Sequence, residues 1–220
     1  MRKILLYIAT VTLSVVAMAQ SSDMRQTFLS MPQKVLPVLT EEIRAQLISN
    51  FDKKQKGEIP SEVRNQFYGY SEITKLTDDF VAVKLDTQTN LEIRKLSQSR
   101  KKYLIGLIYT SKIVPEQSVL VIYDQEWNRI EEEKYFKHPE LADFFSDPSL
   151  LQLNSIKQVL GAIGALSFRY SWVEGSDILR IEMTNFEEPM AQSLYPDASK
   201  WLKPSGVLYK WHRGQLRKEK

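Results

Sequence analysis

The feature that most constrains the fold is a series of short segments between residues 79 and 123 in which apolar and polar side chains alternate. A period of two places successive side chains on opposite faces of a β-strand. The predicted strands span residues 79–85, 91–96, 103–110 and 118–123, with turn-forming residues at 86–90 and Pro115 between the last two strands. Strands joined this closely pair with their chain neighbours, so the sequence predicts an antiparallel β-meander with one face covered and one face polar.

Two amphipathic helices are predicted before the meander. Asp23 can cap a short helix that Pro32 ends, and residues 35–51 carry apolar side chains at spacings of three and four, with Thr40 as a further cap. The Lys-rich residues 52–61 indicate an exposed loop. We expect the apolar side of the longer helix to cover one face of the sheet.

Helix and strand patterns alternate after the meander. Residues 131–147 show no regular period and are interpreted as an irregular connection and hinge, after which Asp147 and Pro148 start a helix that ends near Gly164. The further predicted elements are a hairpin of residues 166–172 and 178–183, a partly helical stretch at 189–202 and a last strand at 206–211. This order predicts an α+β fold of helices on antiparallel sheet. Residues 20–220 are expected to form a single domain, with two helix-plus-sheet halves divided near 131–147 as the alternative.

The N-terminus predicts export. Arg2 and Lys3 precede the apolar residues 4–16, and Ala17-Met18-Ala19 supplies a small-x-small cleavage pattern, so residues 1–19 are interpreted as a signal peptide cut between Ala19 and Gln20. The apolar run is shorter than the ~20 residues of a membrane-spanning helix, and no cysteine is available for lipid attachment. We therefore expect an unanchored periplasmic or secreted protein.

Charge and cysteine content bound the class of partner. The formal net charge is +3, and removing Arg2 and Lys3 lowers it to +1. Proteins that bind nucleic acid concentrate positive charge on one face, so no nucleic-acid partner is expected. Basic clusters at 94–95, 100–102 and 213–220 are interpreted as solvated turns and a frayed tail. Because the chain has no cysteine, its core must hold it together, and a domain of this size can bury roughly 70% of its unfolded surface.

Searches for catalytic and metal-binding motifs assign no catalytic, cofactor-binding or metal-binding residue. Gly-x-Ser-x-Gly and the Gly-rich phosphate loops are absent. A metal set of His138, Glu140 and Asp143 is less favoured than a simple turn, because no cysteine accompanies the histidines. Asp78 and Asp79 could serve a glycosidase only across a cleft, whereas neighbours in a strand face opposite sides.

The aromatic residues raise a carbohydrate-binding hypothesis, because sugar rings stack on exposed aromatic faces. The residues concerned are Trp127, Trp172, Trp201 and Trp211 with Tyr109, Tyr123 and Tyr135. Aromatic residues in β-rich runs belong mainly to the core, so the core interpretation is favoured. The exposed area of these side chains distinguishes the two.

An ordered set of short motifs resembles an exported family of the Bacteroidales, domain of unknown function 3256. The motifs are Phe28-Leu29-Ser30-Met31-Pro32, Leu36-Pro37-Val38-Leu39 with Arg44, Gly69-Tyr70-Ser71, Leu76-Thr77-Asp78-Asp79-Phe80, Ser118, and Tyr123 to Trp127. The chain departs from the family pattern in having Gln46 where an Asp is common and in lacking the cysteines of some members. The resemblance implies a signal peptide, periplasmic or secreted placement and an α+β fold. It implies no activity, cofactor or site residue.

These observations favour a non-catalytic binding or interaction protein of the cell envelope with a protein or glycan partner. The alternative is a hydrolase of glycans or peptides that uses acids such as Asp78 or Asp79. A structural member of a larger envelope assembly would instead carry an extended exposed apolar patch.

Overall fold

The structure, a computed structural model, describes residues 23–58, 62–99 and 102–219. The predicted signal peptide and its cleavage point between Ala19 and Gln20 lie outside the described residues.

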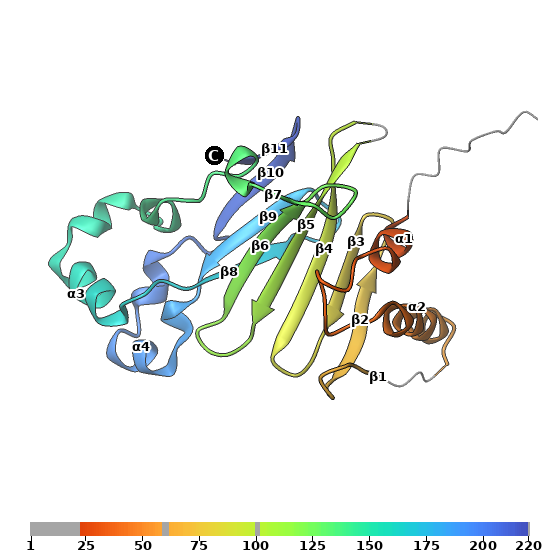
Figure 1. Ribbon diagram of the computed structural model, residues 1–220. Coiled ribbons are helices and arrows are strands. Elements are labelled where there is room, and N and C mark those ends of the chain that lie inside the picture. The colour runs from red at the N-terminus through yellow and green to blue at the C-terminus, as the bar shows by residue number, and fades with distance from the viewer. Residues whose placement is uncertain (1–22, 59–61, 100–101, 220) are drawn as a thin grey trace, which may run out of the picture.

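A seven-stranded antiparallel sheet, in which every strand pairs with its chain neighbour, forms the centre of the molecule (Figure 1). Its strands are β1 (Val63–Arg64), β2 (Tyr70–Leu76), β3 (Phe80–Lys84), β4 (Thr89–Ser97), β5 (Tyr103–Ser111), β6 (Gln117–Tyr123) and β7 (Arg129–Ile130). The predicted meander is confirmed as β3 to β6. Strands β1, β2 and β7 were not predicted from the sequence; they extend the sheet at its two edges.

Two helices cover one face of this sheet (Figure 1). Helix α1 (Met24–Leu29) is capped by Asp23, and helix α2 (Glu41–Gln55) by Thr40, whose hydroxyl accepts from the Ile43 N–H. The apolar pattern starts at residue 35, but residues 33–39 form turns, as Pro37 favours, and the helix begins directly after its predicted cap, Thr40. The loop prediction for residues 52–61 was wrong for 52–55, which are helical.

A second, four-stranded antiparallel sheet has the order β11-β10-β9-β8. Its strands are β8 (Phe168–Trp172), β9 (Ile178–Met183), β10 (Val207–His212) and β11 (Gln215–Lys218), and its helices are α3 (Asn154–Ile163) and α4 (Pro189–Leu194). The hairpin, the partly helical stretch and the strand at 206–211 are confirmed. The frayed-tail interpretation was wrong for residues 213–219, because Leu216 is buried and β11 pairs with β10; Lys220 lies outside the described residues. Asp147 caps a short 3₁₀ turn, Pro148–Gln152, and α3 begins only after Leu153.

The large sheet is buried on both faces. On β4, Leu91 and Ile93 face α1 and α2, whereas Leu96 belongs to a second core shared with the smaller sheet. The expectation of one polar face was therefore wrong. Glu92 and Arg94, which read as polar-face residues, lie on the face that the second sheet covers.

Residues 131–147 are irregular, as predicted, with 3₁₀ turns at Glu132–Lys134 and Leu141–Phe144; they form the first part of the connection between the two sheets, which continues through α3 to β8. Phe136, Phe144 and Phe145 of this connection are buried in the shared core. None of the helices in the described part of the chain combines the length and the apolar character needed to cross a membrane.

Candidate functional site

The acidic pair proposed for hydrolysis lies at the turn between β2 and β3. The Asp79 carboxylate accepts from Arg94 Nη1 at 3.2 Å and from Thr77 Oγ1 at 2.8 Å. The Asp78 carbonyl accepts from the Met24 N–H at 3.1 Å. Neither acid lines the surface hollow between α2 and β2, the hollow at residues 129–133 or the hollow beside Phe144 and Phe186. Asp78 and Asp79 thus serve the turn and the α1 contact.

The three residues of the hypothetical metal site, His138, Glu140 and Asp143, do not converge on one point in the structure, because each bonds to a different partner. His138 Nε2 lies 3.2 Å from Glu132 Oε1, while Asp143 accepts from Lys218 Nζ at 2.5 Å and from the Glu140 N–H at 2.9 Å. In the described ranges, no group of three or more potential ligands is arranged to hold a metal ion.

A buried charged cluster joins the two sheets. Arg94 is 2% exposed and donates through Nη1 to the Ser176 carbonyl at 2.5 Å, with its guanidinium 4.9 Å from the Phe80 ring centroid. The Glu92 carboxylate accepts from the Trp172 N–H at 2.8 Å. Arg94 is therefore a buried connector, and the solvated-turn interpretation of residues 94–95 was wrong.

Burial raises the pKa of Glu92. A raised folded-state pKa favours the protonated acid in the fold, so its stabilising effect is full below the unfolded value of about 4.3 and is lost as the pH rises. We expect Glu92→Gln to unfold at higher urea concentration than the wild type at pH 7.5, with the difference vanishing near pH 4. Exposed Glu126→Gln is the matched control, and an equal difference at both pH values would contradict the assignment.

The burial of the tryptophans shows whether they belong to the core or are exposed for binding sugars. Trp127, Trp172 and Trp211 are buried, and Trp201 packs half-buried against the shared core. Tyr109, Tyr123 and Tyr135 are also half-buried. The core interpretation is confirmed for this set. Among the described residues, exposed aromatic side chains lie elsewhere, at Phe67, Tyr68 and Tyr70, with exposed fractions of 70%, 76% and 54%.

These three residues form the aromatic loop, Phe67–Tyr70, which buried Asn65 holds in place. Asn65 Oδ1 accepts from the N–H groups of Phe67 and Gly69, both at 3.0 Å. Its Nδ2 donates to Ser71 Oγ at 3.0 Å and to the Leu85 carbonyl at 2.8 Å. One buried amide thereby fixes the loop to β2 and to the end of β3.

Tyr68 at the tip of the aromatic loop is held in the left-handed region, with φ at 65°. A bulky side chain rarely adopts this conformation without compensation. The Arg64 guanidinium carbon lies 4.9 Å from the Tyr68 ring centroid, a cation–π contact that orients the ring. The structure maintains an exposed aromatic side chain at a conformational cost.

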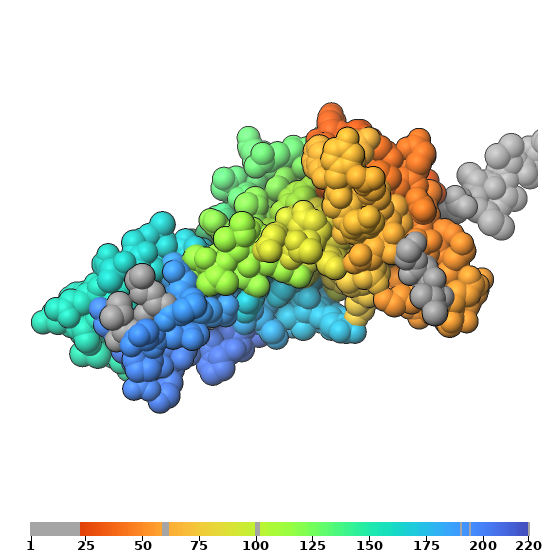
Figure 2. Space-filling model, turned by 90° about the horizontal axis from the view of Figure 1, so that it is seen from below, coloured from red at the N-terminus to blue at the C-terminus, as the bar shows by residue number. Residues whose placement is uncertain are grey.

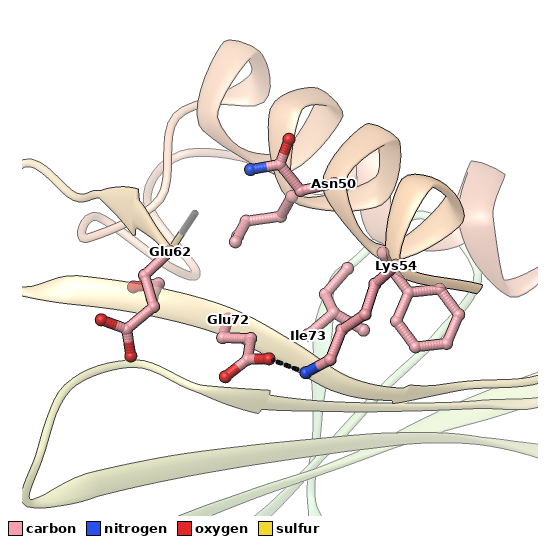
Figure 3. Close-up of a pocket in the computed structure, with 8 residues that line it drawn as sticks. Asn50, Lys54, Glu62, Glu72 and Ile73 are labelled. Carbon is pink, nitrogen blue, oxygen red and sulfur yellow. Dashed lines mark hydrogen bonds and ion pairs between the residues drawn. The ribbon is translucent and has the colours of Figure 1, made fainter. Parts of the chain in front are cut away.

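A cleft opens between α2 and β2 (Figure 3). We call it the α2–β2 cleft; its volume is about 250 Å³, and its lining comprises Leu47, Asn50, Phe51, Lys54, Glu62, Ser71, Glu72 and Ile73. Lys54 Nζ donates to Glu72 Oε1 at 2.5 Å across its mouth, and Glu62 accepts from Lys84 at 3.0 Å. Tyr70 of the loop precedes Ser71, Glu72 and Ile73 of the cleft on β2, so the loop and the cleft are adjacent, although none of the three aromatic residues lines the cleft.

Two further hollows lie in other regions. One, of about 200 Å³, has Phe144, Met183 and Phe186 in its lining, beside Glu182 and Glu187. Arg169 bonds to both of these acids and to Glu116, each at about 3.2 Å, and ties the β5–β6 hairpin to the second sheet. The other, at residues 129–133, has a volume of about 350 Å³ and is more open to solvent than the other two.

The aromatic loop lies at the same end of the large sheet as the β3–β4 and β5–β6 turns, which Figure 2 shows from below. Ile113 and Val114 on the β5–β6 turn are 66% and 56% exposed. Sequence reasoning singled out only Gly69-Tyr70-Ser71 of this region, as part of a resemblance. The sequence does contain one indication of the aromatic loop: three aromatic residues surround a glycine outside any apolar strand pattern.

Comparisons with known proteins agree with this fold. A family described as "Protein of unknown function (DUF3256)" matches residues 16–216. The solved structure of a domain of an uncharacterized protein from Porphyromonas gingivalis W83 has a TM-score of 0.72 and 22% identity, covering 89% of this chain and 98% of that chain. At that identity the likeness shows the fold alone. No curated protein matches the chain.

Proposed function

The chain belongs to the DUF3256 family of proteins of unknown function, and from that premise we propose that it is an exported, non-catalytic binding protein of the cell envelope. The observation that supports this most directly is the aromatic loop. Three large aromatic side chains face solvent on a backbone that Asn65 immobilises. Exposed apolar side chains gathered on a rigid frame are typical of interaction sites, because little conformational entropy is lost on binding.

Export is supported by the N-terminal sequence. Arg2, Lys3 and the apolar residues 4–16 precede a small-x-small cleavage pattern at residues 17–19. A chain processed there starts at Gln20 and is placed in the periplasm or outside the cell.

The hydrolase alternative has weaker support. Asp79 is engaged by Arg94, and neither Asp78 nor Asp79 lines one of the three hollows described. A pair of catalytic carboxyls must flank a substrate in a cleft. The acids that do line the α2–β2 cleft, Glu62 and Glu72, are each paired with a lysine.

The test is retention of purified residues 20–220 on washed envelope fragments of the host. We expect the wild type to sediment with the fragments and the triple variant Phe67→Ser, Tyr68→Asn, Tyr70→Thr to lose about 90% of its binding, since these side chains would supply most of the contact energy. Asparagine tolerates the left-handed backbone of position 68, so the variant is expected to fold.

The matched control is Val119→Thr, which changes a 56% exposed apolar side chain on β6. It should bind as the wild type does. The chain recovered from the host envelope should begin at Gln20 by mass spectrometry. Equal binding of the triple variant and the wild type, or an intact N-terminus at Met1, would contradict the proposal.

A further inference from the structure

We propose that the ligand of the aromatic loop and the α2–β2 cleft is an uncharged polysaccharide chain. This inference rests on the proposed function and names the chemistry of the same site. The carbohydrate-binding hypothesis drawn from the sequence concerned other residues in another part of the fold, and the tryptophans of that hypothesis are largely buried in the core.

The charge balance of the cleft favours a neutral ligand. Lys54 pairs with Glu72, and Glu62 pairs with Lys84, so these four side chains carry no net charge. A charged polymer is recognised by a concentrated field of opposite sign. Arg64 adds one positive charge beside the cleft, and its guanidinium already lies over the Tyr68 ring.

The polar groups of the cleft suit hydroxyl ligands. A hydroxyl both donates and accepts, so it can bridge the ammonium of Lys54 and the carboxylate of Glu72. These two side chains are 57% and 30% exposed and reach the mouth of the cleft from opposite sides (Figure 3). Sugar hydroxyls can therefore replace water there without breaking buried interactions.

The aromatic loop supplies the complementary apolar surface. The C–H faces of a sugar ring pack against aromatic rings, whose negative faces attract the slightly positive C–H groups. Phe67, Tyr68 and Tyr70 offer such surfaces, and two of them also carry a hydroxyl.

The dimensions favour a chain over a small free molecule. The cleft, at about 250 Å³, lies below the ~300 Å³ at which pockets for enclosed small ligands begin. One sugar unit in the cleft, with its neighbours lying along β2 and across the aromatic loop, uses both features. A polymer thereby gains contact area that no single unit could bury.

The experiment repeats the envelope-fragment assay after two treatments of the fragments. Periodate cleaves the vicinal diols of sugars and is quenched and washed away before the protein is added; proteinase K removes surface proteins and is inactivated likewise. We expect periodate to reduce binding at least about tenfold and proteinase K to leave it unchanged. Binding should also vary less than about twofold between about 50 mM and about 0.5 M salt, because no net charge is neutralised.

A second measurement uses defined probes. Neutral hexasaccharides of glucose, of mannose and of N-acetylglucosamine are titrated into residues 20–220 by calorimetry. At least one hexasaccharide should bind. Tyr70→Thr should weaken the affinity for that hexasaccharide about tenfold. Glu72→Gln should weaken the affinity less than about threefold, because an amide still forms a hydrogen bond with a hydroxyl. Val119→Thr should leave it unchanged.

The outcomes separate this inference from the proposed function. Loop-dependent binding that proteinase K removes and periodate spares would identify a protein partner, overturning the glycan inference and leaving the proposed function intact. Binding that falls steeply as the salt concentration rises would identify a charged ligand and would also overturn the inference of an uncharged polysaccharide. Binding unaffected by the triple loop variant would reject the proposed function itself.

Discussion

Gly106→Ala is expected to destabilise the protein by about 3 kcal/mol, at the upper end of overpacking costs in a dense core. Gly106 lies in the middle of β5 and faces the second sheet. A Cβ there would lie 2.6 Å from Trp172 Cζ2 and 3.2 Å from Leu96 Cδ1. Trp172 cannot retreat freely, because it is 5% exposed and its backbone N–H is bonded to Glu92. Urea unfolding followed by circular dichroism measures the loss.

A double-mutant cycle identifies the cause. Trp172→Phe removes the ring atom that the new methyl would meet, so the cost of Gly106→Ala should fall by more than half in that background. The control is Gly161→Ala, where a Cβ meets nothing within 4 Å and alanine favours the helix α3. Additive effects of the Gly106 and Trp172 substitutions would show that the two sheets do not meet at this contact.

Arg44→Met is expected to cost about 4 kcal/mol, because it leaves three carbonyl groups without their donor and each unsatisfied buried group costs roughly 1–3 kcal/mol. The Arg44 guanidinium is buried beneath the segment between α1 and α2 and donates to the carbonyls of Leu29, Met31 and Leu39 at 2.9, 2.6 and 2.7 Å. Methionine fills the same space and satisfies none of them. The loss is read as the difference in the midpoint and slope of urea unfolding.

Two neighbouring substitutions serve as controls for Arg44. Arg44→Lys retains the charge but cannot span three carbonyls from one planar group, so an intermediate cost is expected. Gln46→Met changes an exposed side chain of the same helix and should stay within about 0.5 kcal/mol of the wild type. A tolerated Arg44→Met would mean that water reaches these carbonyls.

The sequence predicted the elements whose signals are local. Asp23 and Thr40 cap helices where expected, and the period-two segments from β3 to β6 became a meander. Strand β11 was missed because Leu216 is its one apolar residue, and such a strand is stabilised by pairing with β10. Strand β2 was missed because its polar residues and the register shift between Ile73 and Lys75 interrupt the alternation.

Burial of the large sheet on both faces could not be predicted from pattern alone. Glu92 and Arg94 mark a polar face by composition, but in the fold Glu92 is half-buried and Arg94 is buried, with contacts from Trp172 and Ser176 some eighty positions away as well as from Asp79. The candidate site was missed for a related reason. Phe67, Tyr68 and Tyr70 are exposed because Asn65 bonds to both their loop and the end of β3, a tertiary arrangement.

The chain-order pairing of the large sheet has a consequence for the folding pathway. Each hairpin of β2 to β6 closes a short loop, so little chain entropy is lost before pairing begins. The smaller sheet is tied on by distant contacts, such as the 2.6 Å bond from Trp211 Nε1 to the Ser97 carbonyl, 114 residues away. We expect a folding nucleus in β3 to β6 onto which residues 168–218 dock late. Substitutions within the meander should therefore slow refolding, whereas those in β8 to β11 should mainly speed unfolding.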